Sequence, residues 1–186
     1  MSIFRIKDPD SVFLEVPYTM DLVGAQLLGE SFERPYFGIW REEWNELFKF
    51  AFIRHPISRF ISCYLDYASR ETRQTMQPFP LDQFAKQAIF APNERLWQQL
   101  LPMSNALHAL DKADYIGRFE RYYQDLDSLM VHLGITKGDE IPIPREDNWK
   151  NIVKQQMSPD VYESVVDYYR QDFNEYNYEV LSYADL

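Results

Sequence analysis

The chain is poor in cysteine, glycine and long apolar runs, and each shortage excludes a class of protein. Its one cysteine, Cys63, forms no internal disulfide, which suits a reducing compartment, and its apolar neighbours predict a buried helical thiol. Six glycines among 186 residues, with 46% hydrophobic residues, exclude a collagen-like or disordered chain. No apolar run reaches the roughly 18 residues of a membrane span, and we expect no secretion signal. The sequence predicts one folded, cytoplasmic domain over residues 1–186.

Positive charge and metal-ligand clusters are scarce as well. The formal net charge is -10, which does not suit binding along a nucleic-acid backbone, so nucleic acid is not an expected partner. The sequence has no Cys/His cluster with zinc spacing, and we expect no metal. It also lacks a hydrolase Gly-x-Ser-x-Gly elbow and the glycine-rich turn of a Rossmann fold.

Strands and helices are predicted to alternate along much of the chain. A β-rich run at 11–16, an apolar run at 48–53 and a short segment at 114–117 predict strands, and helical periodicity follows each of them. Residues 81–110 are typical of short helices, and Ser158 with Pro159 predicts a helix start. This order indicates an α/β fold of three layers, with a mainly parallel sheet flanked by helices. Its ligand crevice would lie beyond the carboxyl ends of the strands.

One such strand end carries the pattern "FKFAFIRHPISRFISCYLDY", residues 48–67. Arg54 directly follows the apolar run, and Ser62 lies eight residues later near the start of a helix. A guanidinium, a hydroxyl and a helix N-terminus together suit a phosphate ester. The alternative is structural: Arg54 pairs with one of the 29 acidic residues and Ser62 faces solvent.

The same stretch resembles the 3'-phosphate-binding segment of sulfotransferases, which follows an apolar strand with Arg-x-Pro-x-x-Arg, an apolar pair and Ser. The similarity is nearest to carbohydrate sulfotransferases of the heparan-sulfate type and their bacterial relatives. It implies a P-loop NTPase-like sulfotransferase fold and the co-substrate 3'-phosphoadenosine 5'-phosphosulfate (PAPS). On that resemblance Arg54 and Ser62 hold the 3'-phosphate, and Arg59 occupies the second arginine position.

Two further segments resemble this family in the same order. "DYIGRFERYYQDLDSL", 114–129, is similar to its Gly-Arg-Phe-Glu strand-to-helix segment, and "YESVVDYYRQDFNEYNY", 162–178, to its C-terminal helix. The resemblance implies that Gly117 and Arg118 help to hold the nucleotide. A structural role for Arg118 against Glu120 or Asp125 is the alternative.

The loop expected to face the sulfate departs from the family pattern. In the family this loop resembles a P-loop, with a lysine that reaches the 5'-phosphosulfate and small residues that let backbone amides approach. The corresponding residues here place tyrosine at the lysine position and an acid nearby: Pro17, Tyr18, Thr19, Met20 and Asp21. Lys49 or Lys150 is a candidate for a compensating cation.

No catalytic base is assigned from the sequence. Relatives use Glu or His to accept the proton of the acceptor hydroxyl. The candidates are three histidines and three glutamates, each of which also suits a structural or solvated role: His55, His108, His132, Glu33, Glu42 and Glu43.

The leading hypothesis is a sulfotransferase that moves a sulfuryl group from PAPS to a hydroxyl of a carbohydrate or similar small acceptor. A second hypothesis is a nucleotide-binding or scaffold protein that has kept the fold and lost the chemistry. A kinase-like or nucleotide-hydrolysing protein is a third, weakened by the missing lysine and the missing Ser/Thr for magnesium. The sequence predicts no oligomeric state.

Overall fold

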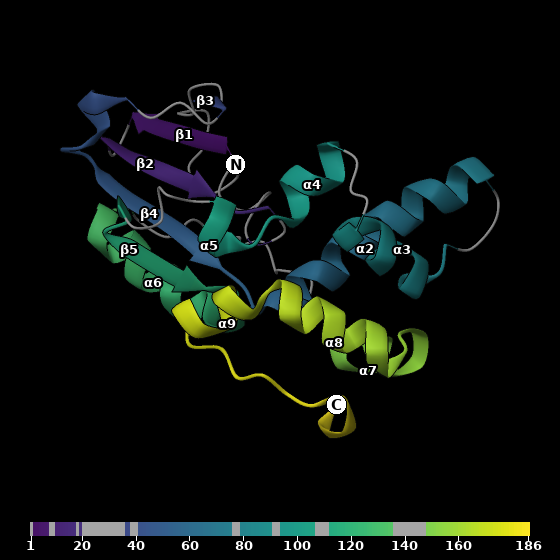
Figure 1. Cartoon of the computed structure of the whole chain (residues 1–186). Helices are drawn as coiled ribbons and strands as arrows, with labels where there is room; N and C mark the ends of the chain where they lie inside the picture. The colour runs from purple at the N-terminus through teal and green to yellow at the C-terminus, as the bar shows by residue number, and fades with distance from the viewer. Residues whose placement is uncertain are drawn as a thin grey trace. The chain divides into compact units, whose positions relative to one another are not determined.

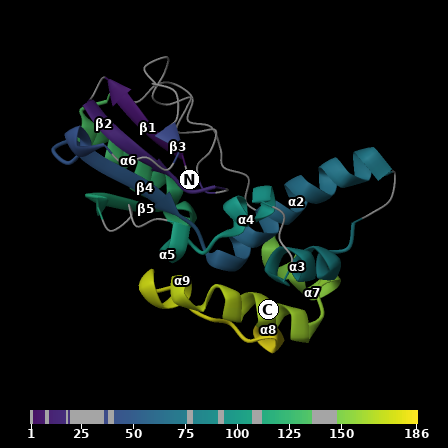
Figure 2. The ribbon, with the colours of Figure 1, turned by 45° about the horizontal axis from the view of Figure 1, so that its top comes forward.

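The computed structural model divides into two compact units, which we describe separately (Figures 1 and 2). The sheet unit comprises residues 1–54 and 107–145, and the helical unit comprises residues 55–106 and 146–186. The structure describes residues 2–7, 10–17, 19, 36–37, 41–75, 79–90, 94–106, 112–135 and 148–186. The prediction that residues 1–186 form a single domain stays a prediction.

The sheet unit holds a mixed sheet whose strands mostly share one direction. Five strands are described: β1 (Ser2–Lys7), β2 (Asp10–Glu15), β3 (Tyr36–Phe37), β4 (Phe48–Ile53) and β5 (Tyr115–Arg118). Their order is β3-β1-β2-β4-β5. β1 is antiparallel to both β2 and β3, whereas β2 pairs with β4, and β4 with β5, in parallel. Among the described strands only β1 therefore runs against the others, and the predicted mainly parallel α/β sheet is confirmed.

The predicted strands correspond closely to the observed ones. The run at 48–53 forms β4 over the same residues, and the runs at 11–16 and 114–117 are each displaced by one residue. β1 was not predicted, because its sequence "SIFRIK" is short and shows no regular alternation of apolar and polar residues. The helix predicted after the first of these runs, over 20–32, lies outside the described residues.

Residues on both faces of the central strands are buried, as is usual for parallel strands. On one face Phe13, Phe50 and Phe52 pack against helix α6 (Tyr122–Leu133) in a single hydrophobic cluster. The alternate residues of β2 and β4 on the opposite face are also buried: Val12, Leu14, Ala51 and Ile53. Gly134 ends α6 in the left-handed conformation, with φ 67°, and its N–H donates to the carbonyls of Met130 and Val131.

The helical unit contains no strand among its described residues. Its helices are α2 (Pro56–Thr75), α3 (Leu81–Phe90), α4 (Glu94–Leu100), α5 (Met103–Ala106), α7 (Trp149–Gln156), α8 (Pro159–Tyr168) and α9 (Arg170–Glu175). α2 buries Ile57, Phe60 and Cys63 on its inner face, so the predicted buried thiol is confirmed. Ser158 is the N-cap of α8 with Pro159 at the first helical position, also as predicted.

None of the described helices is both long enough and apolar enough to cross a membrane. Within the same described ranges, His, Cys, Asp and Glu side chains form no group of three that would suit a metal ion.

Candidate functional site

The carboxyl ends of β2, β4 and β5 meet at one edge of the sheet because these strands run parallel. Leu14 pairs with Ala51, and Ile53 pairs with Arg118. The residues that follow the strands, Pro17 after β2 and Arg54 after β4, therefore leave the sheet at this same edge. This is the edge at which parallel α/β sheets bind ligands.

Arg54 is buried at this edge and lies against an aromatic ring. Its side chain is only 4% exposed, and its guanidinium carbon lies 3.9 Å from the centroid of the Phe119 ring. At this distance the planar cation interacts with the negative face of the ring.

The turn from β5 into α6 sets the position of Phe119. Gly117 has no room for a side chain, because a Cβ there would lie 2.5 Å from the buried ring of Phe52. Asp125, 7% exposed, accepts the backbone N–H of Arg118 at 2.7 Å and forms an ion pair with Arg121 at 3.2 Å. The sequence left open a structural role for Arg118 against Glu120 or Asp125. Asp125 does contact Arg118, through the backbone N–H of that residue, and it also forms an ion pair with Arg121.

The loop after β2 closes on itself at Thr19. Thr19 is 4% exposed, and both its N–H and its hydroxyl donate to the carbonyl of Val16, at 3.3 and 2.6 Å. Pro17 lies inside this turn and is half-buried. Both donors of Thr19 are thus directed at the protein backbone, not outward as in an anion-binding loop. The other loop residues predicted to face the sulfate, Tyr18, Met20 and Asp21, lie outside the described residues.

The remaining residues of the predicted phosphate segment belong to helix α2. Ser62 lies six residues after Pro56, where α2 begins, and is half-buried. The chain passes from the sheet unit to the helical unit between Arg54 and His55, so the structure describes Arg54 and Ser62 each within its own unit. Their joint binding of a 3'-phosphate stays a prediction.

Arg59 holds the end of α4. It is 1% exposed, and its two terminal nitrogens donate to the carbonyls of Gln99, at 3.2 Å, and Leu101, at 2.6 Å. Its guanidinium carbon also lies 5.5 Å from the centroid of the Tyr169 ring. Cations at the C-terminus of a helix satisfy its last carbonyls and interact favourably with its dipole. This gives Arg59 a structural role, and its predicted part in nucleotide binding is not tested by the geometry.

Lys49, a candidate for the missing cation, lies at the amino end of β4. Its ammonium donates to the carbonyls of Asn45 and Leu47, at 3.0 and 2.6 Å, and lies 3.0 Å from Asp114. Burial alone raises the pKa of Asp114, but hydrogen bonds and charge from Lys49, with the charge of His132, lower it below its ordinary value. Lys49 and Arg54 therefore stand at opposite ends of one strand. The other candidate, Lys150, is exposed in the helical unit, with its ammonium 5.7 Å from the Trp149 ring centroid.

The described candidates for a base are placed as follows. In the helical unit His55 stacks on Trp149 at 4.7 Å and meets the edges of Phe173 and Tyr178, both at 5.4 Å. In the sheet unit the His132 ring lies 4.1 Å from that of Phe48, at the edge opposite Arg54.

The glutamates and the tyrosines of the β5–α6 turn give no stronger candidate. Glu42 and Glu43 are exposed in the 3₁₀ turn Glu42–Trp44, and Glu43 pairs with Arg41 at 3.4 Å. Burial raises the pKa values of Tyr115 and Tyr122, so both phenols stay protonated at neutral pH. His108 and Glu33 lie outside the described residues. We assign the role of base to none of these groups.

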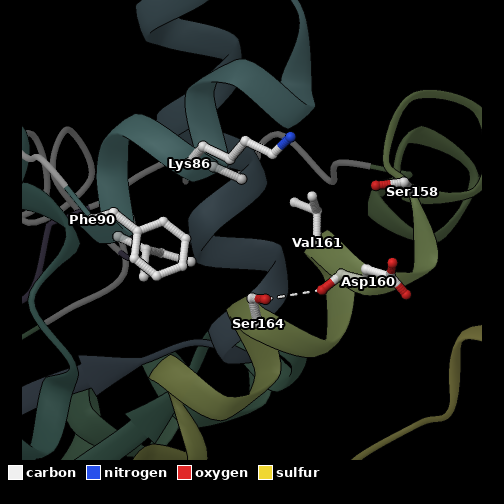
Figure 3. A pocket seen from close by; sticks show the side chains of 8 residues that line it. Lys86, Phe90, Ser158, Asp160, Val161 and Ser164 are labelled. Atoms are coloured by element: carbon white, nitrogen blue, oxygen red, sulfur yellow. Dashed lines mark hydrogen bonds between the residues drawn. The ribbon is translucent and has the colours of Figure 1, made fainter.

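The helical unit also contains a cavity of about 240 Å³ between α3 and α8 (Figure 3). Figure 3 shows Lys86 and Phe90 on the α3 side, and Asp160 and Ser164 on the α8 side, where Ser164 donates its hydroxyl to the Asp160 carbonyl at 2.9 Å. Among the described residues that were predicted to bind the nucleotide, none lines this cavity.

Sequence reasoning missed Phe119 as a contact of Arg54. The two residues are 65 positions apart, and no local pattern joins them. The available signal was their common place in the predicted topology, since each directly follows a parallel strand. Gly117 and Asp125 were part of the recognised "GRFE…D" pattern, but the sequence did not say that they shape the turn beneath Arg54.

Comparison with known proteins gives one family and no individual relative. The model of the sulfotransferase family matches residues 30–179, which is most of the chain. This range contains Arg54, Ser62 and Phe119 and begins after the loop 17–21. Neither the curated proteins nor the solved structures contain a significant match to the chain. On the strength of the family match, the chain belongs to the sulfotransferase family.

Proposed function

We propose that this protein binds PAPS, or its product 3'-phosphoadenosine 5'-phosphate, and transfers the sulfuryl group to a hydroxyl of a carbohydrate or similar small acceptor. The observation that carries the proposal is the position of Arg54, buried at the carboxyl edge of the parallel strands with its guanidinium carbon 3.9 Å from the centroid of the Phe119 ring. In the family to which the chain belongs, the matching arginine position binds the 3'-phosphate of the nucleotide.

The proposed reaction is an in-line displacement at sulfur. The acceptor oxygen forms a bond to sulfur while the bond from sulfur to the bridging phosphate oxygen breaks, and the acceptor proton passes to a base. Arg54 and Ser62 would hold the 3'-phosphate, and the loop of Pro17, Tyr18, Thr19, Met20 and Asp21 would face the sulfate. Arg59 would support this arrangement from the helix that carries Ser62.

Calorimetric titration with 3'-phosphoadenosine 5'-phosphate tests the nucleotide part of the proposal. We expect micromolar binding by the wild type and a roughly 10- to 150-fold weaker affinity in Arg54→Ala, since hydrogen bonds to a charged group contribute about 1.5–3 kcal/mol. A thermal melt of Arg54→Ala confirms that the variant is folded. Absence of binding by the wild type, or equal binding by Arg54→Ala, would overturn this function.

A second candidate function is nucleotide binding without efficient transfer. The observation that favours it is the loop after β2, where tyrosine stands at the lysine position and both Thr19 donors are bonded to Val16. Removing a comparable transition-state donor typically slows catalysis ~100–1,000-fold. A neutral phenol and a closed turn supply less stabilisation to a departing phosphate than a lysine and open amides do.

Transfer of labelled sulfate from PAPS to a panel of sugars separates the two candidates. Transfer by the wild type that is lost in Arg54→Ala supports the sulfotransferase. Nucleotide binding without transfer, together with transfer gained in Tyr18→Lys, supports the impaired protein. Tyr18→Phe is the matched control, because it keeps the ring and removes only the hydroxyl.

A further inference from the structure

The contact between Arg54 and Phe119 assigns a role to a residue outside the phosphate segment. The guanidinium carbon lies 3.9 Å from the ring centroid, which is close for a cation–π pair and restricts where the guanidinium can lie. Arginine has a long side chain that loses much rotamer freedom on binding a ligand, unless its environment orders it beforehand. A ring beneath the guanidinium orders it in this way.

Phe119 is itself held in place from two sides. Before it, Gly117 lets the β5 backbone approach the buried Phe52 ring, with no space for a Cβ. After it, the Asp125 carboxylate accepts the N–H of Arg118 and so fixes the turn in which Phe119 lies. Such support of a binding side chain by residues that do not touch the ligand is typical of ordered sites.

We propose that Phe119 is a positioning residue for nucleotide binding: its ring holds the Arg54 guanidinium in the place from which it binds the 3'-phosphate. This inference rests on the proposed function, in which Arg54 binds that phosphate. It assigns to the "GRFE" segment a role that acts through Arg54, while the residues of that segment need not touch the nucleotide.

The test compares the affinity for 3'-phosphoadenosine 5'-phosphate of the wild type, Phe119→Leu and Phe119→Tyr by calorimetry. Loss of a cation–π pair predicts a roughly 2- to 30-fold weaker affinity for Phe119→Leu. Phe119→Tyr keeps an aromatic face and should bind within about twofold of the wild type. Phe48→Leu is the matched control, because it makes the same change on a half-buried ring at the opposite end of β4 and should leave the affinity unchanged.

A double-variant cycle separates positioning from general support of the fold. In an Arg54→Lys background there is no planar guanidinium to orient, so Phe119→Leu should weaken binding there by less than about twofold. A purely structural role predicts the same loss in both backgrounds, together with a lower melting temperature than that of Phe48→Leu.

The outcomes distinguish the inference from the function on which it rests. Wild-type affinity in Phe119→Leu, with a large loss in Arg54→Ala, overturns the role of Phe119 and leaves the proposed function standing. An equal loss in both backgrounds also overturns it. Absence of nucleotide binding by the wild type overturns both.

Discussion

The two ends of strand β4 each hold a buried cation, and the two cations differ in the contacts described for them. At the amino end Lys49, 8% exposed, is surrounded by two backbone carbonyls and the carboxylate of Asp114. At the carboxyl end Arg54, 4% exposed, lies on the face of an aromatic ring. The Asp114 carboxylate neutralises Lys49 while the two carbonyls accept its hydrogen bonds, whereas the Phe119 ring attracts the Arg54 guanidinium and restricts where it lies. Burial alone therefore does not identify a binding cation, and the chemistry of its contacts has to be considered.

The largest expected effect on the free energy of unfolding is that of replacing Arg59, a third buried cation, which lies in the helical unit. Arg59→Met should lower the free energy of unfolding by about 3 kcal/mol, because two carbonyls at the end of α4 lose charged donors in a buried place. Urea denaturation followed by circular dichroism measures the loss. If Arg59→Met keeps wild-type stability but binds the product nucleotide more weakly, Arg59 binds the nucleotide and does not stabilise the fold.

Lys49 should show a smaller effect of the same kind. Lys49→Met keeps the aliphatic part of the side chain and removes the ammonium. We expect a loss of about 2 kcal/mol in the free energy of unfolding, because the carbonyls of Asn45 and Leu47 lose their hydrogen-bond donor. Nucleotide affinity measured by calorimetry should not change. A drop in affinity in the folded variant would contradict the contrast between the two ends of β4.

Gly117 tests how the ring beneath Arg54 is held. Gly117→Ala places a methyl group against the Phe52 ring and should cost about 1.5 kcal/mol in unfolding free energy, with some loss of nucleotide affinity. Phe52→Leu in the same chain makes room for that methyl group. The double variant should therefore be more stable than the sum of the two single losses predicts, and strictly additive losses would argue against the clash.

The smallest effect is the pH dependence that comes from Asp114. Its pKa in the folded protein lies below its ordinary value, so the unfolded chain binds the proton more readily. The resulting stability is present above the ordinary pKa and is lost as the pH falls through the lower, folded value, in the range below about pH 4. The side chain of Asp114 is 46% exposed, and solvent screening reduces the effect to less than about 1 kcal/mol. Denaturation at pH 7 and pH 3 should show a smaller difference in Asp114→Asn than in the wild type, and an equal difference would exclude Asp114 as the source.

Elements with local signals could be predicted from the sequence. β4 is apolar at every position except Lys49, Gly134 ends α6 in a left-handed conformation, and Ser158 with Pro159 begins α8. The family resemblance rested on such local patterns too, and the family match confirms it.

The contacts that give these patterns their roles are not local. Phe119 lies 65 residues from Arg54, and the carbonyls that bind Arg59 lie 40 and 42 residues away. The sequence placed Arg54 and Arg59 in one motif, but their partners follow from strand pairing and helix packing. The closed turn at Thr19 was missed for another reason: a hydroxyl three residues after a carbonyl is compatible with both a closed and an open loop.

The fully buried Cys63 provides a reporter that needs no engineering. The Cys63 thiol is buried on the inner face of α2, so a soluble reagent reaches it only when the helical unit opens locally. Its labelling rate therefore measures how often that local opening occurs. Because the chain has no other cysteine, the signal comes from one position. Cys63 directly follows Ser62 in the chain. A ligand that binds at Ser62 should therefore make local opening rarer and slow the labelling of the thiol, and the decrease in labelling rate measures how far the ligand stabilises this region.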